Sequence, residues 1–183
     1  MKIVYWSFSL LPSQTANSVS VMKMASAFDS LGHDVTVIAK KGDRSTCCNE
    51  LFENYGVKNN FKIIRRTYPK VKLGWIVWGF RILRIVRRMK PDLVFARDSF
   101  GALLSAFFRS DVFFEVHSEP FGRDKIIYKL LFQLKHIRRV VAISKALQDY
   151  LLKQYSIKEN KIIIAPDAVD QSWLDMSIDK VKS

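Results

Sequence analysis

Short apolar runs alternate along the chain with longer stretches in which apolar residues recur every three or four positions. The short runs are rich in β-branched and aromatic residues, so each predicts a strand and not a helix. We expect seven strands, at Lys2–Phe8, Val35–Ala39, Phe61–Arg65, Leu93–Ala96, Val112–Val116, Val140–Ile143 and Ile162–Ile164. The intervening stretches predict helices near residues 18–31, 46–55, 74–90, 100–108, 124–136 and 145–155.

This alternation predicts the fold class. Strands separated by helices form a parallel sheet with right-handed crossovers, because each helix returns the chain to the same edge. We therefore expect an α/β fold: a doubly wound, mainly parallel, Rossmann-like sheet of about seven strands with helices on both faces. Ligands of such sheets bind at the carboxyl ends of the strands. The informative residues are therefore those that follow each strand.

The first helix should begin near Ser18 and end at Gly32, with Asn17 or Ser18 as its cap. Its apolar stripe is Val21, Met24, Ala25, Phe28 and Leu31. Free N–H groups at a helix start suit phosphate or carboxylate groups. The preceding turn contains no glycine, so the dinucleotide fingerprint is absent. Asn17 and Ser18 are candidates for substrate contact, and simple capping remains the alternative.

Polar residues follow three later strands of the predicted sheet. His117 stands directly after the apolar run "FFEV", where an imidazole can hydrogen-bond a substrate hydroxyl or act as an acid or base. The alternative is a loop histidine that only caps backbone groups. Arg97 and Asp98 follow one strand, and a Ser-Lys pair at 144–145 follows another. No second His or Cys stands near His117 at metal-ligand spacing, so we expect no metal site.

Composition describes an ordinary globular protein. The 183 residues are 49% hydrophobic and 26% charged, which suits one domain with a real core. The two cysteines, Cys47 and Cys48, are adjacent within a polar stretch, so a disulfide framework is not indicated. We expect a reducing, cytoplasmic compartment.

The net charge of +13 is concentrated in one segment. Residues 61–90 carry ten Lys or Arg and no acid. In the predicted helix 74–90 the core arc comprises Trp75, Trp78, Ile82, Ile85, Val86 and Met89. A separate basic stripe comprises Arg81, Arg84 and Arg88. Beside it lie apolar residues that one core stripe does not require, namely Ile76, Val77, Phe80 and Leu83.

Basic residues interleaved with exposed apolar ones suit an anionic membrane surface. We therefore expect peripheral binding at the inner face of the membrane through Arg81, Arg84, Arg88, Ile76 and Phe80. The alternative is a packed helix with solvated arginines. Nucleic acid is not expected as a partner, because no recognition motif is present and the neighbours of the basic residues are aliphatic, not stacking aromatics.

Five segments, in order, carry a family resemblance: "ANSVSVMKMASAFDSLGHDVTVIA", "KPDLVFARD", "FFEVHSEP", "VVAISKALQDYL" and "KIIIAPDAVD". Together they resemble the amino-terminal half of a family 4 glycosyltransferase of the GT-B fold. The resemblance implies an acceptor-side domain over residues 1–170, followed at 171–183 by the start of an interdomain crossover or a tail. It also implies a donor-binding carboxy-terminal domain that this chain lacks, so the chain alone should be inactive.

The resemblance also implies roles for particular residues. His117 matches the family's active-site histidine, which contacts the transferred sugar. Ser144 and Lys145 match the Ser-Lys pair at the start of the next helix. The "ANS" of the first turn departs from the glycine pair of many relatives, which leaves a phosphate contact there unassigned. A retaining mechanism without metal or other cofactor is implied by the family alone.

These observations predict part of a retaining glycosyltransferase of the cell-surface polysaccharide type. It would move sugar from a nucleotide-sugar donor to a glycan or lipid-linked acceptor. A different class of function stays open: a non-catalytic membrane-docking or scaffold subunit that pairs with a separate donor-domain chain. Transfer activity of the assembled protein distinguishes the two.

Overall fold

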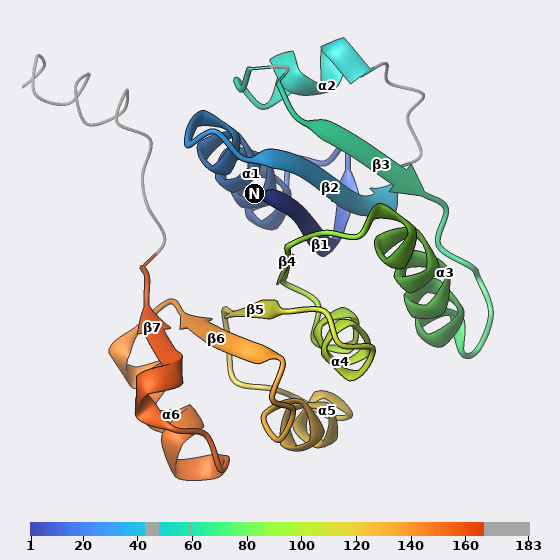
Figure 1. Ribbon diagram of the computed structural model, residues 1–183. Helices are drawn as coiled ribbons and strands as arrows, with labels where there is room; N and C mark the ends of the chain where they lie inside the picture. The colour runs from blue at the N-terminus through green and yellow to red at the C-terminus, as the bar shows by residue number, and fades with distance from the viewer. Residues whose placement is uncertain (43–47, 59, 167–183) are drawn as a thin grey trace, which may run out of the picture.

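The computed structural model describes residues 1–42, 48–58 and 60–166. Seven parallel strands form one sheet in the order β3-β2-β1-β4-β5-β6-β7 (Figure 1). The strands are β1 (Lys2–Leu11), β2 (Asp34–Lys41), β3 (Lys62–Arg66), β4 (Leu93–Ala96), β5 (Val112–Val116), β6 (Ile137–Ala142) and β7 (Ile162–Ile164). The helices are α1 (Ala16–Ser30), α2 (Cys48–Asn54), α3 (Gly74–Met89), α4 (Ser99–Phe107), α5 (Asp124–Leu131) and α6 (Lys145–Gln154), with a short 3₁₀ turn at Glu159–Lys161.

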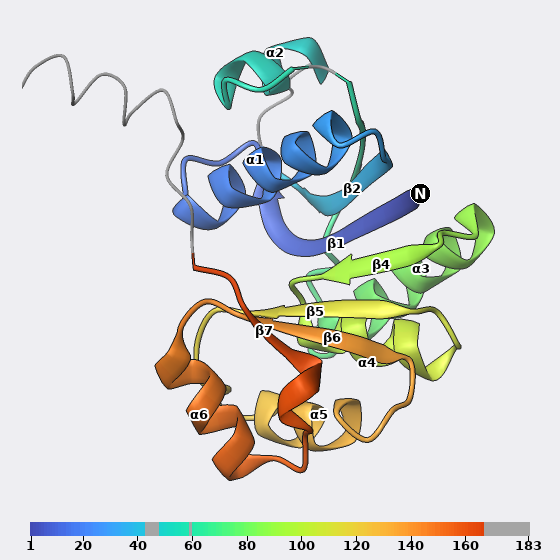
Figure 2. The same ribbon diagram turned by 60° about the vertical axis from the view of Figure 1, so that its left-hand side comes forward.

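The helices cover the two faces of the sheet unequally. Strand order runs outward from β1 in both directions, so right-handed crossovers place α1 and α2 on one face and α3 to α6 on the other. In Figure 2, α1 and α2 lie above the sheet and α4 to α6 below it. Each face has its own buried cluster, one centred on Trp6 and Trp78 and the other on Tyr5 and Met22. The doubly wound fold expected from the sequence is thus confirmed.

The predicted elements are all present, and they differ mainly at their ends. Strand β1 continues to Leu11, because after an irregularity its last residues pair with the end of β2. Helix α5 ends at Leu131, five residues earlier than predicted, since the chain turns there to start β6 at Ile137. The predicted start of the second helix, residues 46–47, lies outside the described residues.

The cap of α1 differs from the prediction. Thr15 is the N-cap, and its hydroxyl accepts from the backbone N–H of Ser18. Asn17 lies exposed within the first turn, whereas Ser18 is buried and donates to the Leu10 carbonyl at 3.0 Å. Leu31, placed on the apolar stripe by periodicity, is 72% exposed because the helix has ended before it.

Helix α3 also corrects one prediction. Leu83 is 4% exposed and belongs to the core cluster that includes Leu104 of α4, so it is not surplus apolar surface. Periodicity placed Leu83 among the apolar residues outside the core arc, and packing against the neighbouring helix α4 brings it into the core. Val77 and Phe80 do remain exposed, at 38% and 50%.

Helix α4 begins at the carboxyl end of β4. The carboxylate of Asp98 caps it by accepting from the Gly101 N–H at 2.7 Å. A Cβ at position 101 would lie 2.6 Å from the Trp6 indole, so only glycine allows this helix to pack so close to β1. Burial raises the pKa of Asp98 to about 6, although the Gly101 N–H acts in the opposite direction.

Replacing Thr15 with Ala should lower the free energy of unfolding by about 1 kcal/mol, because the Ser18 N–H loses the Thr15 hydroxyl as one of its two acceptors. The matched control is Asn17→Ala, which removes a similar exposed polar side chain from the same turn and should change stability by less than about 0.5 kcal/mol. Urea unfolding curves of both variants measure the difference. Equal losses in the two variants would contradict the assignment of the cap.

The raised pKa of Asp98 predicts a pH-dependent stability difference. The folded state binds the Asp98 proton more tightly than the unfolded state, whose pKa is near 3.8, so ionisation of this carboxyl costs stability as pH rises through about 6. Asp98→Asn keeps a capping oxygen and does not ionise. Its stability relative to wild type should therefore rise by about 1–3 kcal/mol between pH 4 and pH 7.5. Urea unfolding at both pH values tests this, and a constant difference would refute it.

Candidate functional site

An open cavity of about 1500 Å³ lies at the carboxyl edge of the sheet, along the flank of α1. It exists because α1 and α2 cover only part of their face, leaving β5 to β7 without a helix on that side. Its walls come from α1, from the segments after β4 and β5, and from the end of β7. Polar residues lining it include Asn17, Ser20, Lys23, Arg97, Asp98, Ser99, Glu115, His117, Ser118, Arg123 and Asp124.

A chain of polar contacts crosses the floor of this cavity. Tyr5 in β1 donates its phenolic proton to Glu115 Oε2 at 3.0 Å. Glu115 Oε1 lies 2.8 Å from His117 Nε2, and His117 Nδ1 lies 3.1 Å from Nη2 of Arg97. Arg97 in turn donates through Nη1 to the Ser20 hydroxyl of α1 at 2.8 Å. The chain therefore ties β1, β5, the β4–α4 turn and α1 together.

The charges of the residues in this series of contacts balance one another. Burial raises the pKa of Glu115, but the hydrogen bond from His117 and the charge of Arg97 outweigh it and hold the pKa below its usual range. The distance from Arg97 Nη1 to Glu115 Oε1 is 4.0 Å. Burial, with the neighbouring Glu115 charge, raises the pKa of Tyr5 far above its usual range. At neutral pH Glu115 is thus a carboxylate and Tyr5 a proton donor.

A second polar group lines the cavity beside this chain. Ser99 donates to Asp124 at 2.8 Å, which joins the start of α4 to the start of α5 next to Asp98. The guanidinium of Arg123 lies 4.4 Å from the centre of the Trp75 ring. This wall therefore carries both a cation and carboxylates that can accept hydrogen bonds from hydroxyl groups.

Only some of the predicted substrate-binding residues line the cavity. Arg97, Asp98, His117 and Asn17 line one cavity. Ser18 is buried in the turn below it. The Ser144–Lys145 pair lies among the residues of α6: Ser144 caps that helix by accepting from Leu147 N–H at 3.2 Å.

Lys145 is likewise committed within its own helix. Its ammonium donates to Gln148 at 2.7 Å and pairs with Asp149 at 3.0 Å. Neither Ser144 nor Lys145 contributes to the lining of the cavity. The structure thus gives both residues a role in α6 and no contact with the cavity.

Sequence patterns missed Glu115, Tyr5 and Ser20. Glu115 is an acid within an otherwise apolar strand and is 4% exposed. A buried acid needs partners, so its position two residues before His117 was the available signal. Tyr5 and Ser20 carry no comparable signal, because each fits the pattern of its own strand or helix.

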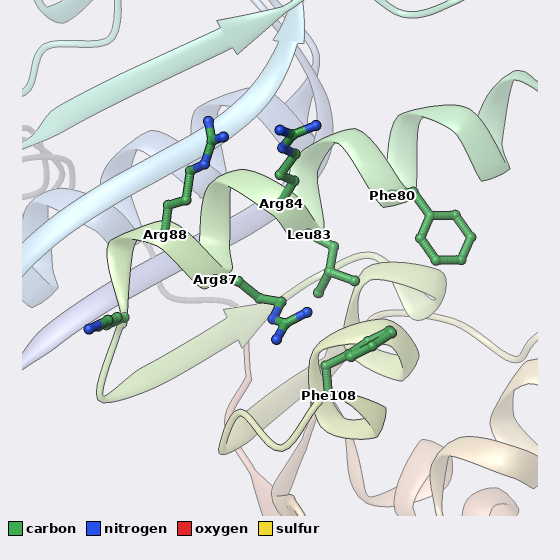
Figure 3. A pocket seen from close by; sticks show the side chains of 7 residues that line it. Phe80, Leu83, Arg84, Arg87, Arg88 and Phe108 are labelled. Carbon is green, nitrogen blue, oxygen red and sulfur yellow. The ribbon is translucent and has the colours of Figure 1, made fainter.

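A separate groove of about 640 Å³ lies between the ends of α3 and α4. Its lining residues are Phe80, Leu83, Arg84, Arg87, Arg88, Lys90 and Phe108. Figure 3 shows the Arg87 side chain reaching from α3 toward Phe108, while Arg84 and Arg88 extend away from that ring. The Arg87 guanidinium lies 5.2 Å from the ring centre. Two of the predicted basic residues and Phe80 therefore share one surface.

Across ranges 1–42, 48–58 and 60–166, no three His, Cys, Asp or Glu side chains are grouped as metal ligands would be. Within the same ranges, no helix has the length and apolar character needed to cross a bilayer.

Solved structures share this fold. A glycosyltransferase from Rickettsia africae matches with a TM-score of 0.66 and 17% identity, over 96% of this chain and 45% of that one. HepE from Anabaena, solved with UDP and glucose, matches at 0.61 and 16%, over 94% and 46% of the two chains. A UDP-GlcNAc 2-epimerase from Neisseria meningitidis, bound to UDP-GlcNAc, matches at 0.68 and 13%, over 100% and 50%. The chain thus spans about half the length of these proteins.

Sequence comparison identifies the family. No curated protein sequence matches significantly. The sequence profile of Glycosyltransferase Family 4 matches residues 18–173, which include α1 from Ser18 onward, the β4–α4 turn and the His117 loop. The profile covers most of the chain, and the seven-stranded fold agrees with it. The chain therefore belongs to Glycosyltransferase Family 4.

Proposed function

We propose that this chain is the acceptor-side part of a retaining glycosyltransferase that moves sugar from a nucleotide-sugar donor to a glycan or lipid-linked acceptor. One observation carries the proposal: His117 lies in the cavity at the carboxyl edge, hydrogen-bonded to Arg97 and with Nε2 at 2.8 Å from the buried carboxylate of Glu115. Such an edge is where ligands bind in doubly wound sheets. The family match supports transfer of a sugar.

The donor is proposed from the structural neighbours. HepE was solved with UDP and glucose, and the meningococcal epimerase with UDP-GlcNAc. This chain covers 46% and 50% of those two proteins. We therefore assign residues 1–170 to the acceptor side and most of the donor contacts to a second domain, on the same polypeptide or on a separate chain. Residues 171–183, proposed as the start of the crossover, lie outside the described residues.

Within this arrangement each cavity residue has a chemical task. His117 would hydrogen-bond a hydroxyl of the transferred sugar. Arg97 would supply positive charge beside it, and the Asp98 carboxyl would accept from acceptor hydroxyls on the opposite wall. Catalysis by such groups depends on holding both reactants together and on stabilising the leaving diphosphate. A single side of the cleft does neither, so transfer should require both domains.

An anionic membrane surface is the partner we propose for α3. Arg81, Arg84 and Arg88 are exposed, and within the described residues no ion pair involves them. Exposed Val77 and Phe80 precede them in the first half of the helix. Arginines near a charged bilayer contribute about 1 kcal/mol each, and apolar side chains add by insertion. Binding there would place the protein peripherally on the inner face of the membrane.

The isolated 183-residue chain should show no transfer of labelled sugar from a panel of nucleotide donors to a membrane extract. The full-length gene product, or this chain with a donor domain added, should show it. In the active assembly His117→Ala should lower the rate by roughly 100-fold or more, because a contact with the transferred sugar is lost. The matched control is His136→Ala, whose ring pairs with Asp111 away from the cavity and should leave the rate unchanged.

Two outcomes would contradict this proposal. Robust turnover by the isolated chain would show that it is not one side of a divided cleft. Tight pairing with a donor-domain chain that transfers sugar equally well without this one would favour the alternative, a non-catalytic membrane-docking or scaffold subunit.

Replacing Arg81, Arg84 and Arg88 with Glu should abolish most binding to vesicles that contain anionic lipid, because three attractive charges become repulsive. Flotation with neutral and anionic vesicles measures this. The matched control replaces the exposed Lys135, Lys153 and Lys158 with Glu, which lowers the net charge by the same six units elsewhere on the surface. Equal loss in both variants, or equal binding to neutral vesicles, would refute a surface on α3.

A further inference from the structure

We propose that Glu115, held by Tyr5, fixes His117 as the neutral imidazole with its proton on Nε2. Its Nδ1 is then a hydrogen-bond acceptor at the cavity floor, occupied by Arg97 until a substrate hydroxyl replaces it. The first statement concerns the protein alone. The second rests on the proposed function.

The assignment of the ring proton follows from the two partners. A carboxylate can only accept hydrogen bonds, so the ring atom 2.8 Å from Glu115 Oε1, which is Nε2, carries a proton. A guanidinium can only donate, so Nδ1, at 3.1 Å from Arg97 Nη2, carries none. The lowered pKa of Glu115 keeps the first partner ionised at neutral pH.

Other forms of the ring are disfavoured by the same contacts. The opposite tautomer would place a bare nitrogen against the carboxylate and an N–H against the guanidinium, which are two repulsive contacts. The doubly protonated ring keeps the first hydrogen bond and loses the second, because Nδ1–H would face another donor. Only the neutral Nε2–H form satisfies both neighbours.

We call the contacts of His117 with Glu115 on one side and Arg97 on the other the clamp. Its Glu115 side is buried and its Arg97 side is accessible. The Glu115 side chain is 4% exposed and receives a second hydrogen bond from the fully buried Tyr5. The Arg97 side chain is 10% exposed and the His117 ring 23%, and both line the cavity. A ligand therefore reaches the Arg97–His117 contact before it reaches Glu115. A hydroxyl that displaces Arg97 finds an acceptor at Nδ1, which suits a sugar.

Glu115 and Tyr5 are on this account positioning residues. Neither is predicted to touch substrate. Glu115 sets the tautomer of His117 and the direction of its ring, and Tyr5 sets the direction of the carboxylate. Holding a catalytic imidazole in one tautomer through a buried carboxylate is an effective use of such a partner.

The test is nitrogen NMR of the histidine side chains in the 183-residue chain at pH 7.5. The chain has three histidines, and the His117 signals are those absent from the His117→Gln spectrum. Long-range correlation spectra distinguish protonated from bare ring nitrogens. We expect His117 to be neutral with its proton on Nε2. A ring protonated on Nδ1, or on both nitrogens, would overturn the proposal without the need for any variant.

Glu115→Gln makes the test sharper. The amide has nearly the shape of the carboxylate but no charge, and it can turn either its oxygen or its N–H toward Nε2, so the ring-nitrogen signals of His117 should shift away from the wild-type pattern. The matched control is Asp111→Asn, which alters the other histidine–carboxylate pair, at 3.1 Å from His136 Nδ1, and should leave His117 unchanged. Tyr5→Phe is a milder second variant in case Glu115→Gln fails to fold. It should broaden or shift the same signals, and an unchanged His117 in both variants would refute the clamp.

Activity of the assembled enzyme provides the separate readout. Glu115→Gln should lower kcat by at least about tenfold, as loss of a tautomer-setting carboxylate does elsewhere, with a smaller change in KM for the donor. Glu115→Asp, which restores a carboxylate, should recover part of the loss. If the tautomer is as proposed but no transfer is found, the clamp stands and the proposed function fails. If transfer occurs and Glu115→Gln is fully active, the clamp's role in catalysis fails.

Discussion

Strand β1 lies in the middle of the sheet, and the chain winds away from it first through β2 and β3 and then, in the other direction, through β4 to β7. Because parallel crossovers are right-handed, the reversal sends α1 and α2 to one face and the later helices to the other. The loops after β1 and β4 consequently diverge, and a space opens between them. The cavity, the exposed flank of α1 and the position of Arg97 beside Ser20 all follow from this change of direction.

The cavity floor contains a charge that the fold must compensate. An isolated carboxylate removed from water costs several kcal/mol, yet Glu115 is almost fully buried. One oxygen accepts from the Tyr5 hydroxyl, the other lies 2.8 Å from His117 Nε2, and Arg97 supplies the opposite charge nearby. Each of the three partners comes from a different part of the chain. The electrostatic requirement of one residue therefore fixes the relative placement of β1, β4 and the His117 loop.

Periodicity predicted most of the fold, because the strands contain short runs of β-branched and aromatic residues and the helices between them are amphipathic. The ends of the elements were less predictable. Asn17 and Thr15 are both plausible caps by residue type, and only backbone geometry favours Thr15. Leu83 was assigned to the apolar surface outside the core arc, since a single-helix pattern contains no information about the neighbouring α4.

For the site, the rule that residues after parallel strands converge was sufficient to predict that Arg97, Asp98 and His117 line one cavity. The same rule did not distinguish Ser144 and Lys145, whose polar atoms are used within α6. The rule could not identify Glu115 as a cavity residue, because Glu115 lies inside its strand and not after it. Side chains that act from within a strand are recognised only when their partners on other strands are known.

The direction of α3 sets how far the basic groove lies from the cavity. Because α3 runs antiparallel to the strands, its last turn, with Arg87 and Arg88, lies toward the amino edge of the sheet, whereas His117 follows the carboxyl end of β5. The 16-residue helix is about 24 Å long. A membrane that touched only the groove would therefore stand about that far from the cavity. A membrane that lay along the whole exposed face of α3, from Val77 to Arg88, would lie beside both edges of the sheet and, under the proposed function, would bring the proposed lipid-linked acceptor nearer to the cavity. The exposed apolar residues Val77 and Phe80, toward the amino-terminal half of the helix, favour this flatter contact over one made by the arginine-rich end alone.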